Sequence, residues 1–346
     1  MTSQVSIGEQ VAQMVDLIGA FYGLPQSPAL SSLIETRSFE TRNRLARLRS
    51  KPSQDRIRIA ISIKGIGAKE EECLERNNPE IALVQPSDAD IVITDPHTPD
   101  LDALLSADAL RVFWAHDHHH TFAHYVMHLI KTNIVVPAHF CRRDHLAAFN
   151  RHIADTVPAT TNQWSQEEIA AFSARPAALA RHNALYGGFG AYDVCLDRSM
   201  FVGALMERLP EHALSVRRIQ NADDPFFSMS ARERYDEWRG YKVSLAAAIN
   251  QDIPIRIFDA LATGQIPIIP DSIVNLNWII SVEDQQRLGI ERYHFEDPDS
   301  AISAWRRALT NFDRLGEQGI QTRIEYFLKN HSLIQRVEKI LRALPI

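Results

Sequence analysis

The stretch of this chain that most constrains its fold is residues 241–271, YKVSLAAAINQDIPIRIFDALATGQIPIIPD. It reads as a buried strand, a loop, a helix that starts at Arg256, a glycine that ends this helix, and a second buried strand before Asp271. Strands that alternate with helices are typical of a parallel sheet with helices on both faces. The stretch therefore predicts a doubly wound α/β fold.

Strand-like and helix-like segments alternate through most of the chain. Strands are predicted at residues 56–63, 89–94, 110–115, 133–137, 213–219 and 241–249, and residues 185–193 read as a strand followed by a loop. Helices are predicted at residues 30–49, 101–109, 142–153, 198–209, 229–239, 300–315 and 318–343. A chain of 346 residues with this pattern suits two domains.

Composition excludes several classes of protein. The formal net charge of −6 argues against nucleic-acid binding through bulk electrostatics. Cys73, Cys141 and Cys195 lie far apart without a CxxC spacing, which argues against a disulfide framework or a cysteine zinc site. The N-terminal residues do not read as a signal peptide and no window is apolar enough to cross a bilayer, so we expect a cytoplasmic protein.

Arg256 is the first candidate for ligand binding. An isolated cation at the start of a helix opposes the helix dipole, so a bound anion is the simplest reason for its presence. A guanidinium beside a helix N-terminus suits a diphosphate, and α/β folds bind ligands beyond the carboxyl ends of their strands. The competing interpretation is an ordinary i,i+3 pair between Arg256 and Asp259 on the helix surface.

The same segment carries Lys242, Asn250, Arg256, Asp259 and Gly264, followed by the run PIIPD. This combination resembles the nucleotide-sugar-binding half of GT-B glycosyltransferases, above all their CgeB-like, exostosin-like and fucosyltransferase-like branches. The resemblance implies two Rossmann-like domains that face a cleft. It also implies transfer of a sugar from a nucleotide-diphospho-sugar to a hydroxyl acceptor, with no metal and no cofactor beyond this donor.

On this resemblance the chain divides into four parts. We expect an α-helical N-terminal extension at residues 1–52 and an N-terminal Rossmann-like acceptor domain at residues 53–180. A C-terminal Rossmann-like nucleotide-sugar domain is expected at residues 181–330. The amphipathic helix at residues 331–346 is expected to return to the N-terminal domain.

The resemblance also implies roles for the donor-binding residues. Arg256 and Lys242 supply cations for the diphosphate, and Asn250 belongs to the same donor site. Asp259 accepts hydrogen bonds from ribose or sugar hydroxyls. Retaining relatives carry an acidic residue upstream of this position, whereas this chain has Gln251 there, which favours an inverting mechanism.

Glycines at residues 187–190 form a second candidate. The sequence GGFG after an expected strand allows a tight turn whose amides, with Gly188 among them, face a phosphate or the leaving group. A plain hairpin or linker turn is the alternative. Arg218 ends the next expected strand, where it would be a further phosphate cation or an ordinary surface arginine.

A histidine-rich run at residues 114–128 is the third candidate, and it follows an expected strand. An inverting transferase needs a general base for the acceptor hydroxyl, and an Asp–His pair suits this task near neutral pH. Asp117 with His118 or His119 is our choice of catalytic residues. The CgeB-like branch has a similar W-x-x-D-x-H strand end, which supports the location.

Metal binding is the competing interpretation of this run. His120, His124 and His128 recur at i,i+4 spacing, and His116 and His118 could join them. The run has no HExxH glutamate and no nearby cysteine, so we predict no metal site. Two functions remain as alternatives: a metal-dependent hydrolase that uses the His116–His128 cluster, and a non-catalytic sugar-nucleotide-binding protein.

The identity of the acceptor is inferred only from the family. We expect a surface polysaccharide, a lipid-linked glycan or a protein, and no nucleic acid. A lipid-linked acceptor would require peripheral contact with the inner face of the membrane. Trp278 follows apolar neighbours and is predicted to lie in the core. The sequence distinguishes neither the donor base nor the sugar.

Overall fold

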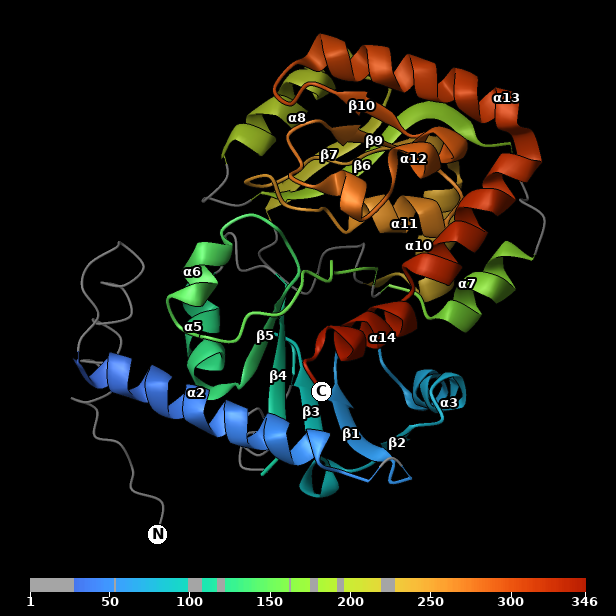
Figure 1. Ribbon diagram of the computed structural model, residues 1–346. Coiled ribbons are helices and arrows are strands. Elements are labelled where there is room, and N and C mark those ends of the chain that lie inside the picture. The colour runs from blue at the N-terminus through green and yellow to red at the C-terminus, as the bar shows by residue number, and fades with distance from the viewer. Residues whose placement is uncertain are drawn as a thin grey trace. The chain divides into compact units, whose positions relative to one another are not determined.

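A computed structural model describes residues 28–52, 54–98, 108–116, 122–161, 163–174, 180–191, 196–218 and 228–346. The chain forms two compact units, each built around its own sheet (Figure 1). Unit 1 comprises the residues up to Val157 together with Glu338–Ile346, and unit 2 comprises Pro158–Val337. Unit 2 thus begins well before residue 181, where the sequence led us to expect the second domain.

Unit 1 is built on a parallel five-stranded sheet, here called sheet A, in the order β2-β1-β3-β4-β5. Its central strands are apolar and buried because helices cover both faces of such a sheet. The strands are β1 (Ile57–Ser62), β2 (Ile81–Leu83), β3 (Ile91–Thr94), β4 (Leu110–Ala115) and β5 (Ile134–Pro137).

Four α-helices and one 3-10 turn accompany sheet A in the described residues. They are α2 (Pro28–Arg49), α3 (Ala68–Asn77), η1 (Pro86–Asp88), α5 (Phe122–Lys131) and α6 (Arg143–Ala147). The apolar side of α2 packs with α5, β4 and β5 around Phe113 and Phe149. The α-helical N-terminal element is therefore part of unit 1 and shares its core.

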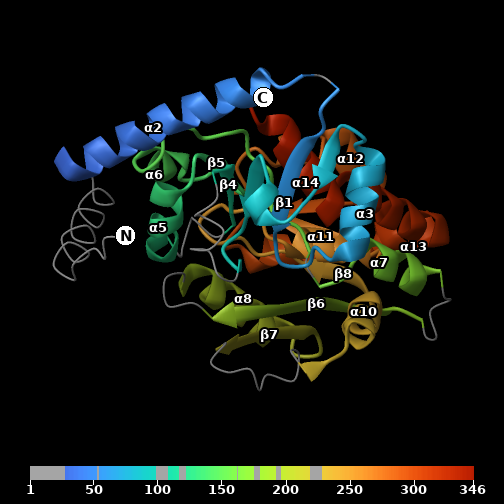
Figure 2. The same ribbon diagram turned by 90° about the horizontal axis from the view of Figure 1, so that it is seen from below.

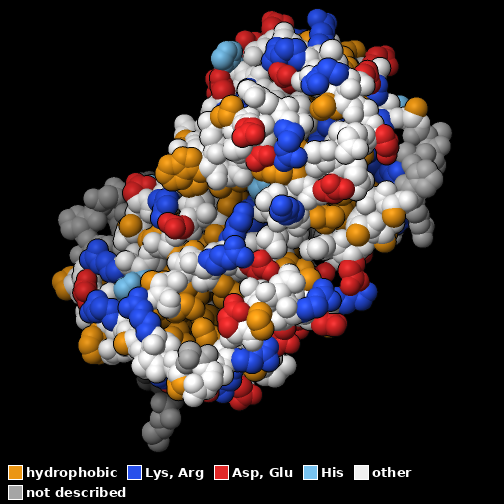
Figure 3. Space-filling view, turned by 45° about the vertical axis from the view of Figure 1, so that its right-hand side comes forward, with side chains coloured by type: hydrophobic (Ala, Val, Ile, Leu, Met, Phe, Trp, Pro, Cys, Tyr) orange, Lys and Arg blue, Asp and Glu red, His pale blue; other side chains and the backbone are white. Residues whose placement is uncertain are grey.

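The basic end of α2 is held by acceptors of unit 1. Arg44 and Arg47 pair with Asp108 at 3.3 and 2.9 Å, and Arg49 Nε donates to the carbonyl of Pro345 at 2.9 Å. On the face drawn in Figure 3, Lys and Arg side chains lie among Asp and Glu side chains rather than in one block. This mixture agrees with the small negative net charge.

Unit 2 is built on a second parallel five-stranded sheet, here called sheet B, in the order β10-β9-β8-β6-β7. In Figure 2 the long arrow of β6 runs beside β7. The strands are β6 (His182–Ala191), β7 (Ala213–Arg218), β8 (Tyr241–Leu245), β9 (Ile266–Pro270) and β10 (Glu291–Tyr293).

Helices pack against sheet B and complete the unit. They are α7 (Gln166–Ser173), α8 (Leu196–Arg208), α10 (Ala231–Arg239), α11 (Arg256–Ala262), η2 (Leu276–Trp278), α12 (Val282–Leu288), α13 (Pro298–Asn330) and α14 (Leu333–Ala343). The first half of α13 and α8 share an apolar cluster with β6, β8 and β9. Gly316 interrupts α13 with φ 58°, and the last helix α14 begins in unit 2 and ends in unit 1.

The predicted α/β class with parallel sheets is confirmed, and the eight predicted strands, with the one before Asp271 among them, are present in substance. The sequence missed β2 and β10, which have three residues each. The single helix predicted at 318–343 is wrong, because the chain breaks at His331 and Ser332 between α13 and α14. The helix predicted at 101–109 falls almost entirely outside the described residues. No described helix has the length and apolarity that a bilayer crossing requires.

Candidate functional site

The carboxyl edge of sheet B is the place where the sequence predicts donor binding. Strand β8 ends at Leu245, and residues 246–255 lead from it to the start of α11 at Arg256. The apolar residues 246–249 and Ile253 are buried, so this connection is part of the core rather than a loose loop. It holds the first turn of α11 at the edge where parallel sheets receive ligands.

Arg256 is held against aromatic rings at this edge. Its guanidinium carbon lies 5.2 Å from the ring centre of Phe189 and 5.8 Å from that of Trp238. Cation–π contacts of this kind orient the guanidinium but leave its N–H donors unused. Among the described residues, no carboxylate lies within ion-pair distance of Arg256 and no group hydrogen-bonds to its side chain. The i,i+3 ion pair with Asp259 is therefore not formed.

Asp259 lies behind Arg256 in the interior of unit 2, with 1% of its surface exposed. Burial raises the pKa of its carboxyl group to about 6, and Thr161, the charge of Arg256 and Gln163 partly offset this rise. In the described residues, neither carboxylate oxygen has a hydrogen-bond partner of normal geometry. Burial keeps Asp259 away from solvent, so in this state it acts on its neighbours rather than on a ligand directly.

The turn before α11 has an unusual backbone. Asn250 and Gln251 are exposed and have φ values of 48° and 67°, in the left-handed region that non-glycine residues rarely adopt. Asp252 fixes the turn, because its Oδ1 accepts a hydrogen bond of 2.6 Å from the amide of Ile249. Such conformations cost about 1–3 kcal/mol each and concentrate at ligand sites.

The turn predicted at residues 187–190 is wrong. These residues continue β6 and pair with β7, with Gly188 opposite Ser215. A side chain at Gly187 would place its Cβ 2.8 Å from the ring of Phe189, so this glycine leaves room for the ring under Arg256. Gly188 thus lies on a strand beside the site, and a contact between its amide and the donor stays a prediction.

The structure does not bring Lys242 together with Arg256. Lys242 is the second residue of β8 and lies toward the amino end of the strand, whereas Arg256 follows its carboxyl end. The Lys242 ammonium pairs with Asp313 at 2.7 Å and lies 5.9 Å from the ring centre of Phe312. Its charge is thus engaged inside unit 2.

Several other predicted residues fall outside what the structure describes. Asp117, His118 and His119 lie in the undescribed segment after β4, and so does His120. Arg218 is the last residue of β7, at the carboxyl edge of sheet B, but its side chain is not described. The three catalytic assignments and the Arg218 assignment therefore stay predictions.

The described part of the histidine run shows packing contacts. His128 stacks on Phe113 with ring centres 4.8 Å apart, and His116 meets the ring of Trp114 edge-on at 4.2 Å. Burial and the charge of His97 lower the pKa of His116 to about 3, so it is neutral at pH 7. Within the described ranges, no group of three or more His, Cys, Asp or Glu side chains could hold a metal ion.

Two features of unit 2 escaped the sequence analysis. Trp278, which the sequence places in the core, is 78% exposed, on the segment after β9. Asp271 and His294, which directly follow β9 and β10, are hydrogen-bonded to each other through Oδ2 and Nδ1. Strand β10 has three residues, too few to show the alternation of apolar and polar residues that marks a strand. The sequence therefore shows little sign that His294 follows a strand.

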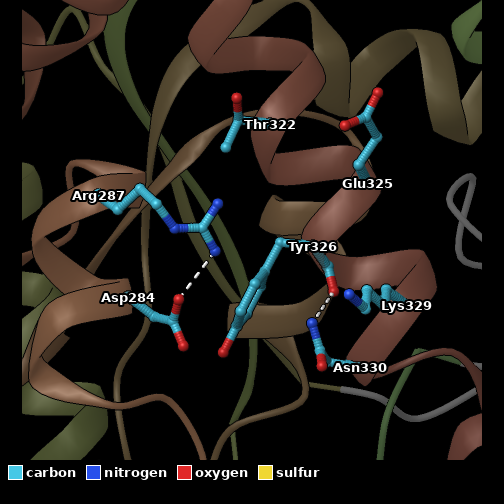
Figure 4. Close-up of a pocket in the computed structure, with 7 residues that line it drawn as sticks. All are labelled: Asp284, Arg287, Thr322, Glu325, Tyr326, Lys329 and Asn330. Atoms are coloured by element: carbon cyan, nitrogen blue, oxygen red, sulfur yellow. Dashed lines mark hydrogen bonds and ion pairs between the residues drawn. The ribbon is translucent and has the colours of Figure 1, made fainter.

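A pocket of about 420 Å³ lies elsewhere on unit 2, between α12 and the second half of α13. Figure 4 shows Arg287 directed toward Asp284, at 2.8 Å, above the ring of Tyr326. The lining residues are Asp284, Arg287, Thr322, Glu325, Tyr326, Lys329 and Asn330. None of them belongs to the predicted donor site.

No protein-family model and no curated protein sequence matches this chain. Among solved structures, it is similar to sucrose-phosphate synthase from Thermosynechococcus elongatus, with 10% identity, 83% of this chain and 98% of that chain covered, and a TM-score of 0.47. It is similar to an α1,3-fucosyltransferase at 13% identity, with 82% and 93% covered and a TM-score of 0.38. The catalytic domain of starch synthase IV from Arabidopsis thaliana matches at 11% identity, with 79% and 76% covered and a TM-score of 0.42. Likenesses this distant assign no activity to this chain.

Proposed function

We propose that the protein is a glycosyltransferase, which moves a sugar from a nucleotide-diphospho-sugar to a hydroxyl acceptor. The observation that carries this proposal is Arg256, a cation held by two aromatic rings at the carboxyl edge of sheet B with its donors unused in the described residues. An immobilised guanidinium without a protein acceptor is suited to a diphosphate, because it makes bidentate hydrogen bonds to phosphate oxygens.

The chemistry follows from where charge develops. As the bond between the anomeric carbon and the phosphate oxygen breaks, negative charge builds on the leaving diphosphate, and Arg256 stabilises it. In this proposal the left-handed turn at Asn250 and Gln251, the amide of Gly188 and the Arg218 side chain line the donor site. Asp259 supports Arg256 from the interior. Asp117, His118 and His119 are the acceptor-side bases that the sequence nominates.

Thermal-shift binding to UDP, GDP, CMP, ADP and dTDP tests this proposal. Binding stabilises the folded state by mass action, so the correct nucleotide raises the melting temperature in proportion to the logarithm of its concentration. We expect a shift with one diphosphate that is lost in Arg256→Ala and kept in Arg234→Ala, a matched arginine of the neighbouring helix α10. A chain that binds none of these nucleotides contradicts the proposal.

The stereochemical outcome, the acceptor class and membrane contact belong to the same proposal. Gln251 in place of an acidic residue favours inversion, and analysis of the product anomer checks it. We infer a glycan, lipid-linked or protein acceptor from the family resemblance. The alternatives, a metal-dependent hydrolase and a non-catalytic nucleotide-sugar-binding protein, gain no specific support from the described residues.

A further inference from the structure

The carboxyl edge of sheet B carries a second polar arrangement beside Arg256. Asp271 follows β9 and His294 follows β10, and these strands are paired neighbours. Nδ1 of His294 is hydrogen-bonded to Oδ2 of Asp271. Because a carboxylate only accepts, Nδ1 carries the proton of the neutral imidazole. The lone pair of the neutral ring is then on Nε2, the atom that can take up a proton.

This pair is held by its surroundings. The amide of Phe295 donates to the second carboxylate oxygen of Asp271 at 3.3 Å. The backbone of His294 donates to Ser300 Oγ at 2.9 Å and accepts from the amide of Asp297 at 3.2 Å. The His294 side chain itself is 78% exposed. Nε2 is therefore presented to solvent from a fixed backbone.

The pair lies on the side of the sheet where the donor is proposed to bind. Strands β8, β9 and β10 are consecutive in the sheet, and neighbouring strands are about 4.8 Å apart. The Arg256 guanidinium lies against Phe189 of β6, three strand spacings or about 14 Å from β10. In this proposal the donor extends its sugar from Arg256 toward the end of β10.

We propose that His294, oriented by Asp271, is the catalytic base of the transfer reaction in place of the Asp117–His119 group that the sequence nominates, an inference that rests on the proposed function. Its Nε2 takes the proton of the acceptor hydroxyl as the acceptor oxygen bonds to the anomeric carbon. The bond from this carbon to the donor phosphate oxygen breaks, and the diphosphate leaves with the electron pair. Asp271 is a positioning residue, which fixes the tautomer and stabilises the imidazolium that forms.

Substitution of His294 tests this inference. The probe is release of nucleoside diphosphate from UDP-, GDP- and dTDP-hexoses, with methyl glycosides as hydroxyl acceptors. His294→Gln is expected to lower kcat roughly 10²- to 10⁴-fold and to remove the fall in rate that imidazole protonation causes at low pH. Nucleotide binding, measured by thermal shift, stays as in the wild type. Asp271→Asn lowers kcat less, because the base remains.

The matched control is His182→Gln, an exposed histidine at the opposite, amino edge of sheet B, which leaves kcat and the pH profile unchanged. The inference is overturned if His294→Gln keeps the wild-type kcat and pH profile while Asp117→Asn or His119→Gln loses activity. The proposed function would then still stand. Absence of nucleotide binding by the wild type overturns the proposed function and this inference together.

Discussion

At the amino edge of sheet B, buried or half-buried cations bind acceptors of the protein itself. Arg181 and Arg323 donate to carbonyls at or next to the C-terminal ends of α11 and α12, and Lys242 pairs with a carboxylate of α13. The distances are 2.9 Å from Arg181 Nη2 to Thr263 O, 2.9 Å from Arg323 Nε to Gly264 O, 3.1 Å from Arg323 Nη1 to Leu288 O and 2.7 Å from Lys242 Nζ to Asp313 Oδ1. These cations complement the negative ends of helices and tie the fold together.

At the carboxyl edge of the same sheet, Arg256 touches aromatic rings, and its N–H donors have no acceptor among the described residues. His294 presents Nε2 to solvent. The number of cations does not separate the two edges. What separates them is whether the donors already have protein acceptors. A cation with its donors satisfied stabilises the fold, whereas a cation held in place without acceptors is available to a ligand.

The sharpest test of this comparison is the removal of one arginine from each edge. Arg323 is fully buried, and burial lowers its pKa to about 9. Arg323→Met leaves the carbonyls of Gly264 and Leu288 without a donor and should cost about 3–5 kcal/mol of unfolding free energy. Arg256→Met should change it by no more than about 1 kcal/mol. Urea unfolding of both variants measures the two values, and equal losses would break the comparison.

Asp259 should make stability depend on pH. Its folded pKa, raised to about 6 from a reference of 3.8, means that the folded state binds the proton more tightly than the unfolded chain. Stability therefore falls as pH rises between these values and stays lower above them, by roughly 3 kcal/mol. The unfolding free energy of Asp259→Asn relative to that of the wild type should therefore rise by about this amount between pH 4 and pH 7. Urea unfolding at both pH values decides, and parallel pH dependence of the two proteins would exclude a buried acid here.

Substitution of one glycine near each edge of sheet B compares how tightly the backbone is packed at the two edges. Gly264 has φ +75°, and a Cβ there would lie 2.6 Å from Ile320 Cγ2 and 3.3 Å from the Arg181 guanidinium. Gly264→Ala should cost roughly 1–3 kcal/mol. Gly188 has ordinary strand geometry, and a Cβ there would lie 3.5 Å from Ser215 Oγ, so Gly188→Ala should stay within about 1 kcal/mol of the wild type. Thermal unfolding of both variants compares them.

The smallest effect is expected from the ion pair of Lys242. Its partner Asp313 is largely exposed, and exposed pairs contribute at most about 1 kcal/mol. Lys242→Met should lower the unfolding free energy by no more than this, and the difference should shrink in high salt. Unfolding at low and high ionic strength checks both points. A loss of several kcal/mol would mean that Lys242 contributes more to the amino edge than one surface pair.

Local pattern was enough to predict most strands and the position of Arg256 at a helix start. The strands and the helix start at Arg256 are both marked by local runs of apolar residues. In β4 and β9 every residue of such a run is buried. Strands of three residues, β2 and β10, are too short to show a period. Residues 187–190 were misassigned as a turn because pairing with β7, a partner distant in sequence, keeps them extended.

The site was harder to predict than the fold, for a similar reason. Lys242 and Arg256 are close in sequence, but the strand between them places their side chains toward opposite edges of the sheet. Asp271 and His294 are far apart in sequence, and only the pairing of β9 with β10 brings them together. Contacts that depend on strand order carry no local sequence signal.

Calorimetric titration of Arg256→Ala and Lys242→Ala with the nucleoside diphosphate that stabilises the wild type tests the central claim most directly. If unused donors mark the ligand-binding edge, Arg256→Ala should weaken binding by about 2–3 kcal/mol, roughly 30- to 150-fold, because charge-assisted hydrogen bonds to phosphate are lost. Lys242→Ala should change the affinity less than about twofold. Equal losses in the two variants, or undiminished binding by Arg256→Ala, would contradict the account.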